Sequence, residues 1–179
     1  MCHRPRLACT TAGTSQRGLQ VVGPVGPCPS CRRHKGVAYP EHMPIPVRAY
    51  AHVRLTVTNI ERSRAFYDDV FGLPVAFEVP PGADDATREQ LAFLFGGVIY
   101  QLGDSLLGLR PVATDSFSED RVGLDHVSFA MSSRTDLDAA AVLLDDRGVS
   151  HGGVKDIGAG YILEFRDPDN ISLELFAPK

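Results

Sequence analysis

The chain from Met43 onward has no cysteine, few basic residues and no long apolar run. Without cysteine, this part cannot depend on disulfide bonds, which favours a cytoplasmic location. No apolar run approaches the roughly 20 residues that a membrane-spanning helix needs. The 12 basic residues stand against 21 acidic ones, and nucleic-acid binding depends on lysine and arginine for phosphate neutralisation. We therefore expect a partner that is neither nucleic acid nor membrane.

The first 42 residues differ sharply from the rest. They hold all four cysteines, three of the six histidines, and six basic residues against one acidic residue. The motif "CPSCRRH" (28–34) could supply half of a zinc site, but the other cysteines and histidines match no common zinc module. The segment also lacks the continuous apolar stretch of a secretory signal peptide. We expect residues 1–42 to be a disordered extension or a mis-assigned start. A role for this segment in binding another protein is a weaker alternative.

The remainder contains two copies of one pattern. The first copy opens with a strand-like segment, "AHVRLTV" (51–57), followed by a helix-like segment, "NIERSRAFYDDVFG" (59–72). The second opens with "DHVSFAM" (125–131), followed by "SRTDLDAAAVLLDDRG" (133–148). Asn59 and Ser133 are expected N-caps, and Gly72 and Gly148 fit helix C-termini.

Strands, rather than a second helix, are expected after each helix. The segments are 73–79, 91–103 and 105–111 in the first copy and 149–154, 160–166 and 171–178 in the second. The fold class is thus α+β, with two β-α-β-β-β modules. One domain (48–178) comprises module 1 (48–111), a linker (112–123) and module 2 (124–178).

Strand alternation sorts the side chains onto two faces. Leucine, valine and phenylalanine fill one face, which should pack on the helices. The other face carries His52, Arg54, Arg110, His126, Glu164, Arg166, Glu174 and Phe176. In the repeat His52 corresponds to His126, and Glu174 corresponds to Gly108, which should leave an opening. Two histidines and one carboxylate suit non-haem Fe(II) or catalytic zinc, although a single histidine on a strand is more often only hydrogen-bonded or exposed.

The opening strand and helix of each copy (51–72 and 125–148), together with "FRDPDNISLELFAP" (165–178), resemble the vicinal oxygen chelate superfamily. It includes glyoxalase I, extradiol dioxygenases, fosfomycin-modifying enzymes, methylmalonyl-CoA epimerases and bleomycin-resistance proteins. The resemblance implies a divalent metal (Fe²⁺, Mn²⁺, Zn²⁺ or Ni²⁺) on His52, His126 and Glu174. It also implies that the two modules form an open, cup-shaped barrel, closed either within one chain or across a homodimer. The substrate would be a small molecule chelated through two neighbouring oxygens.

Departures from each named member leave the reaction open. Glyoxalase I and the epimerases use a fourth ligand where this chain has Gly108. The dioxygenases and fosfomycin enzymes have a tyrosine where it has Glu164. We expect a metal-dependent enzyme, glyoxalase-like or dioxygenase-like (a lyase, isomerase or oxygenase), with Glu164 as acid or base and with Arg54, Arg110, Arg166 and Phe176 contacting the substrate. The alternative is a protein that only binds and sequesters a small molecule, as bleomycin-resistance proteins do.

Overall fold

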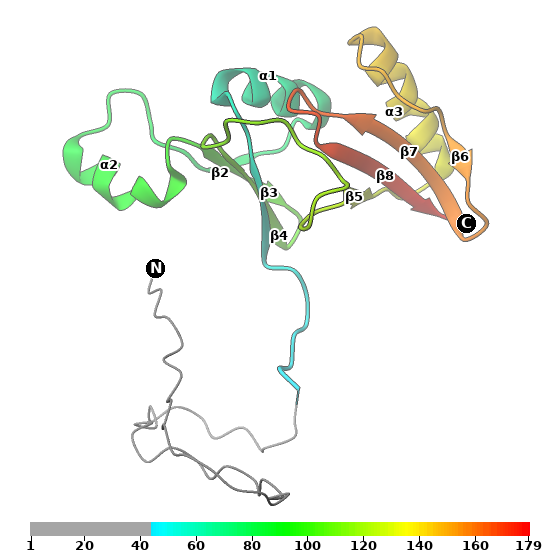
Figure 1. Cartoon of the computed structure of the whole chain (residues 1–179), viewed down its shortest axis with the longest axis horizontal. Helices are drawn as coiled ribbons and strands as arrows, with labels where there is room; N and C mark the ends of the chain where they lie inside the picture. The colour runs from blue at the N-terminus through cyan, green and yellow to red at the C-terminus, as the bar shows by residue number, and fades with distance from the viewer. Residues whose placement is uncertain (1–43) are drawn as a thin grey trace, which may run out of the picture. The chain divides into compact units, whose positions relative to one another are not determined.

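The structure, a computed structural model, describes residues 44–179. The strands of the first module are β1 (His52–Thr56), β2 (Val75–Phe77), β3 (Val98–Leu102) and β4 (Ser105–Arg110). Those of the second are β5 (Val127–Ala130), β6 (Lys155–Asp156), β7 (Gly160–Arg166) and β8 (Ser172–Pro178). They form two separate four-stranded sheets, with the orders β1-β4-β3-β2 and β5-β8-β7-β6 (Figure 1). The predicted α+β class and paired modules are confirmed.

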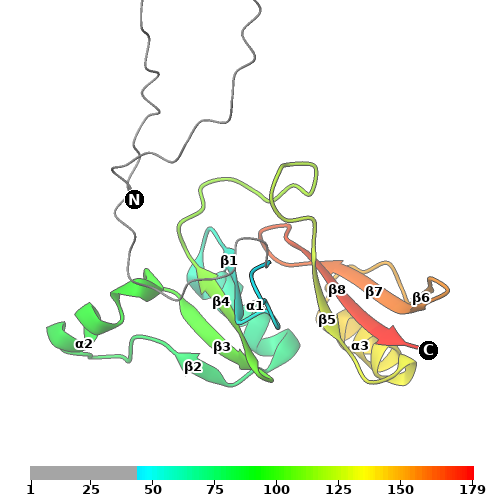
Figure 2. The same ribbon diagram turned by 90° about the horizontal axis from the view of Figure 1, so that it is seen from below.

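One long helix belongs to each module: α1 (Ile60–Phe71) and α3 (Arg134–Asp146), each beside its own sheet (Figure 2). The side chain of Asn59 caps α1 by accepting a hydrogen bond from the Arg62 amide at 2.8 Å. Ser133 does the same for α3 through the amide of Asp136 at 3.2 Å. Gly72 ends α1 in the left-handed conformation (φ 56°). These local signals place the helices where the sequence predicts them.

The apolar face of each sheet packs against its helix, as the alternation predicts. The buried side chains on these faces include Leu55, Leu107, Leu109, Phe129, Leu163, Leu173 and Leu175. The core continues between the modules, because the rings of Phe71 on α1 and Phe129 on β5 lie 4.9 Å apart. The opposite faces of both sheets are left to the polar residues identified above.

The prediction of a strand over 91–103 is wrong for the first half of this segment. Ala92–Leu94 form a 3₁₀ helix (η1), and Phe95 is left-handed (φ 55°). The strand begins only at Val98, after Gly96 and Gly97. The apolar run instead buries Leu94 completely in a turn. The preceding loop contains a short helix, α2 (Asp85–Gln90), which the sequence analysis did not anticipate.

The predicted strand at 149–154 is also displaced. Within this segment the only pairing is an isolated bridge between His151 and Phe165. The regular edge strand, β6, begins at Lys155, directly after the predicted segment ends. Gly153 lies in the left-handed region (φ 69°) and breaks the extended backbone before β6 begins. The predicted strand at 73–79 shortens to β2, with a register shift between Val75 and Phe77.

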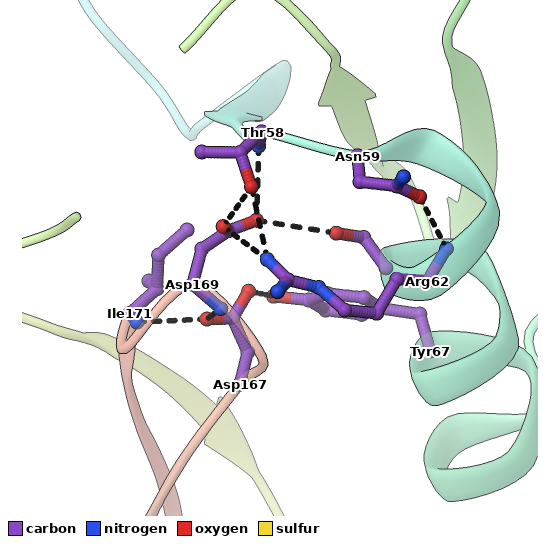
Figure 3. Close-up of polar contacts among 8 residues, drawn as sticks. Thr58, Asn59, Arg62, Tyr67, Asp167, Asp169 and Ile171 are labelled. Carbon is purple, nitrogen blue, oxygen red and sulfur yellow. Dashed lines mark hydrogen bonds and ion pairs between the residues drawn. The ribbon is translucent and has the colours of Figure 1, made fainter. Parts of the chain in front are cut away.

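A buried polar cluster joins the two modules (Figure 3). Asp169, in the turn between β7 and β8, accepts hydrogen bonds from the Thr58 amide at 3.0 Å and from Arg62 at 2.5 Å. Asp167 accepts one from the Tyr67 hydroxyl at 3.2 Å. The turn is closed by the Asn170 amide, which donates to the Asp167 carbonyl, and Asn170 has the expected left-handed conformation (φ 67°).

The two carboxyl groups of this cluster have opposite pKa shifts. Burial opposes the charge of Asp169, but the hydrogen bonds from Thr58 and the charge of Arg62 hold its pKa below the usual value. Burial raises the pKa of Asp167, although the amides of Ile171 and Asp169 partly offset it. Asp169 is therefore the charged partner that links the β7–β8 turn to the start of α1.

Candidate functional site

The strand register places Gly108 and Glu174 at equivalent positions. β1 runs parallel to β4 with Arg54 opposite Gly108, and β5 runs parallel to β8 with Ser128 opposite Glu174. Arg54 and Ser128 each lie two residues after the histidine of their module. The alignment inferred from the repeat is therefore confirmed by the pairing of the strands.

His126 and Glu174 face each other in module 2. Nε2 of His126 lies 3.9 Å from Oε1 of Glu174, and the Ser128 hydroxyl donates to that same oxygen at 2.6 Å. Nδ1 of His126 lies 2.5 Å from Oδ1 of Asp125. Because a carboxylate can only accept, Nδ1 carries a proton, and in the neutral imidazole Nε2 is the nitrogen without one. Such a carboxylate–histidine contact is the usual way to orient a metal-binding imidazole.

Asp125 is a site residue that the sequence analysis missed, although it directly precedes His126. Its hydrogen bond, with a smaller contribution from the charge of Glu174, raises the pKa of His126 despite partial burial. The His126 side chain is 42% exposed and that of Glu174 only 16%. The pair therefore presents one nitrogen and one carboxylate to the open face of the second sheet.

His52 lies on the equivalent face of the first sheet, not beside this pair. It lines a pocket with Arg54 and residues of β2, η1, β3 and β4. Among residues 44–179, no three His, Cys, Asp or Glu side chains are grouped so that they could hold a metal ion. A single chain thus brings together two of the three predicted ligands, and the third belongs to the other module. The CxxC motif lies outside the described residues.

Gly108 lines the pocket beside His52, and the side chain of Arg54 covers part of it. A Cβ atom at this position would lie 2.9 Å from Cγ and 3.4 Å from Nε of Arg54. The Arg54 side chain therefore crosses directly over Gly108 and occupies the position that a Cβ atom would take. Its terminal nitrogens donate to the carbonyls of Phe93 at 3.0 Å and Leu94 at 3.2 Å. An opening is present beside Gly108, which lines the pocket with His52, but the guanidinium of Arg54 lies where the second module has its carboxylate.

The proposed acid or base, Glu164, is opposite Glu174 on the neighbouring strand β7. Adjacent carboxylates repel each other, and here Lys155 on β6 compensates by an ion pair with Glu164 at 2.7 Å. Both side chains of that pair are about half exposed. None of the three candidate arginines pairs with Glu164 among residues 44–179. Lys155 was missed because the pairing of β6 with β7 decides its position.

Arg166 and Arg110 are held by other groups. Arg166 binds both carboxylate oxygens of Glu119 in the linker, at 2.5 and 3.1 Å, which lowers the pKa of Glu119 to about 2. Arg110 places its guanidinium 4.0 Å from the ring centre of Phe95. Phe176 is half-buried and packs over Gly160. Of the predicted substrate-binding residues, only Arg54 lines a pocket with a predicted metal ligand.

Comparison with known families agrees with this architecture. The family described as the Glyoxalase/Bleomycin resistance protein/Dioxygenase superfamily matches residues 49–175. The chain belongs to this superfamily. The match spans both modules and the linker. No curated protein matches the chain significantly. Among residues 44–179, no helix is long and apolar enough to cross a membrane.

Solved structures of other superfamily members have the same fold. A glyoxylase/bleomycin resistance protein/dioxygenase domain from Frankia sp. EAN1pec is 28% identical, with a TM-score of 0.59 over 74% of this chain and 99% of that one. A lactoylglutathione lyase from Agrobacterium tumefaciens is 20% identical (TM-score 0.56; 74% and 96% covered). The fosfomycin resistance protein FosX from Listeria monocytogenes, in complex with Mn(II) and sulfate, is 17% identical (TM-score 0.55; 74% and 92% covered). The latter two show a common fold only.

Proposed function

We propose that the chain is a divalent-metal-dependent enzyme acting on a small molecule with two neighbouring oxygens. The observation that carries the proposal is the pairing of His126 and Glu174, with Asp125 fixing the imidazole and Ser128 fixing the carboxylate. This donor set fits a divalent ion, and relatives such as FosX are found with Mn(II). His52 would complete the ligands from a second copy of the chain, since its own module does not bring it to the pair.

A divalent ion bound there would polarise the two oxygens of the substrate. The residues of the chain would do the rest. His126 and Glu174 would hold the ion from the wall of the second sheet, and His52 from the facing wall. Glu164, one strand beyond Glu174, would accept or return the proton of the substrate, while the ion pair with Lys155 would orient Glu164.

The test is the metal content of the full chain, purified without chelators and then loaded with Mn²⁺, Fe²⁺, Zn²⁺ or Ni²⁺. Loss of a residue that hydrogen-bonds to a metal ligand typically lowers metal affinity by about 10–100-fold. We therefore expect Asp125→Asn to weaken metal binding by about that much. His126→Ala and Glu174→Gln should weaken it by at least about 100-fold.

The matched control is His151→Ala. This histidine contacts Asp145 rather than the candidate ligands, so metal binding should be unchanged. If Glu174→Gln bound metal as tightly as the unmodified chain, the proposed ligand set would be wrong. If the unmodified chain bound none of the four ions, the metalloenzyme would be ruled out.

The second candidate function is binding without catalysis. The pocket beside His52 favours it, because that pocket is mostly apolar and complete within one chain. A protein that sequesters its ligand would bind it equally well with and without metal and would return it unchanged. Incubating the chain with a bound compound and analysing the products separates the two functions.

A further inference from the structure

The pocket in module 1 has the size and lining of a small-molecule site. Its volume is about 340 Å³, within the usual range of roughly 300–1,000 Å³ for ligand pockets. It opens on the face of the first sheet that carries His52. Four apolar residues, Phe77, Phe93, Ile99 and Leu106, form most of its lining.

Two aromatic rings form one wall of the pocket. The rings of Phe77 and Phe93 meet edge to face, with centroids 6.3 Å apart and an angle of 72°. They come from different elements, β2 and η1, and their side chains are 46% and 47% exposed. Large apolar side chains held in such a half-exposed pair have ring surface that an apolar ligand can bury. Ile99 supplies a buried apolar floor.

The pocket also contains a fixed positive charge. Arg54 crosses Gly108 and donates one hydrogen bond from each terminal nitrogen to the η1 carbonyls, which leaves further N–H groups unused. Its Nε is buried without a hydrogen-bond partner. No carboxylate among residues 44–179 forms an ion pair with Arg54. The guanidinium is thus positioned by backbone contacts, and its charge is not neutralised by them.

We propose that this pocket binds an aromatic carboxylate. The ring lies against Phe77 and Phe93, and the carboxylate lies toward Arg54 and the edge that carries His52. Such a ligand matches both properties of the pocket, whereas a purely apolar ligand leaves the charge unused and a small acid leaves the rings uncovered. That this ligand is the substrate rests on the proposed function; binding itself requires only module 1.

The test is isothermal titration of the full, metal-free chain with three probes. Mandelate has a ring and a carboxylate, lactate has the same acid without the ring, and benzyl alcohol has the ring without the charge. We expect mandelate to bind at least about tenfold more tightly than either of the others, since each missing contact is worth about 1.4 kcal/mol or more. Equal affinity for lactate and mandelate would overturn the aromatic assignment.

Variants of the lining locate the binding. Phe93→Leu keeps an apolar side chain and removes the ring, and Arg54→Gln removes the charge and keeps a donor. We expect each to weaken mandelate binding by about tenfold, and Arg54→Gln to leave benzyl alcohol binding unchanged. Phe77→Leu repeats the test of the ring if Phe93→Leu does not fold. The control is Arg110→Gln, which removes an arginine stacked on Phe95, outside the pocket.

Two results separate this proposal from the metal site. Mandelate binding that persists in metal-free His126→Ala protein supports the pocket even if no metal is ever bound. Mandelate binding that is unaffected by Phe93→Leu and Arg54→Gln overturns the pocket proposal, whatever the metal content of the chain.

Discussion

At the scale of single residues, the two modules use the same position in opposite ways. Glu174 on β8 is a carboxylate braced by Ser128. Gly108 on β4 has no side chain, and Arg54 from β1 lies over it. A cup made of both walls would therefore hold one carboxylate and one guanidinium in place of two carboxylates. The added positive charge favours an anionic substrate beside the metal ligands.

The Gly108→Ala substitution tests this arrangement. The new Cβ would lie 2.9 Å from Cγ of Arg54, which is in the middle of the side chain and cannot move without displacing the guanidinium. We expect a loss of about 1–3 kcal/mol in the free energy of unfolding, typical of overpacking, measured by urea denaturation. In an Arg54→Ala background the obstacle is gone, so the same substitution should cost much less. Equal costs in both backgrounds would show that Arg54 does not fill the space.

At the scale of elements, the junction between α1 and the β7–β8 turn depends on Asp169. Its side chain is 5% exposed and accepts hydrogen bonds from Thr58 and Arg62, across the module boundary. Arg62 is half exposed, so water screens part of its charge. The Thr58 amide and hydroxyl, by contrast, would lose a buried acceptor. The hydrogen bonds from Thr58 therefore matter more than the ion pair.

We expect Asp169→Asn to lower the free energy of unfolding by about 2–4 kcal/mol at pH 7. The pKa of Asp169 is below its usual value in the folded chain. The stabilisation by its charge is therefore complete above the unfolded pKa, about 3.9, and is lost as the pH falls through the folded pKa. The difference between the two proteins should shrink over that interval in urea titrations at successive pH values.

Asp167 acts in the opposite direction, because its raised pKa means that its charged form is less favourable in the folded chain than in the unfolded chain. Both proteins retain Asp167, but Asp169→Asn removes the charge of Asp169, which helps to raise the pKa of Asp167. The contribution of Asp167 therefore cancels only in part in the comparison. A difference that stayed constant from pH 7 to pH 2 would show that Asp169 contributes through shape and not through charge.

The elements also show which features sequence reasoning can reach. Asn59, Ser133 and Asn170 act through neighbours within four residues, so their caps and turn could be predicted. The structure of the stretch before Val98 could not be predicted, because an apolar run is compatible with a buried strand and with a turn that buries Leu94.

Contacts between distant segments were beyond sequence reasoning. The repeat located Glu174 and Gly108 correctly, since strand pairing follows the pattern in both modules. The position of Arg54 over Gly108 depends instead on η1, whose carbonyls hold the guanidinium. The bond between Thr58 and Asp169 joins residues 111 positions apart. Neither contact has a local signal.

At the scale of the whole molecule, the proposed metal site requires His52 to lie beside His126 and Glu174. Within one chain they lie on different sheets, and the modules are joined by the Asp169 cluster and by the core between Phe71 and Phe129. Rearranging the modules to close a cup would break these buried contacts. Pairing with a second copy would not, because it uses the exposed faces of both sheets.

Mixing two inactive variants distinguishes the two arrangements. Chains carrying His52→Ala and chains carrying His126→Ala should each lose tight metal binding. If cups form between chains, a mixed dimer has one cup with both substitutions and one cup with neither. Denaturing the variants together and refolding them should then restore tight metal binding, measured by elemental analysis of the refolded dimer. Each variant refolded alone is the control. If the mixture bound no more metal than the variants refolded separately, the cup would have to close within one chain, and the Asp169 cluster would have to open to allow it.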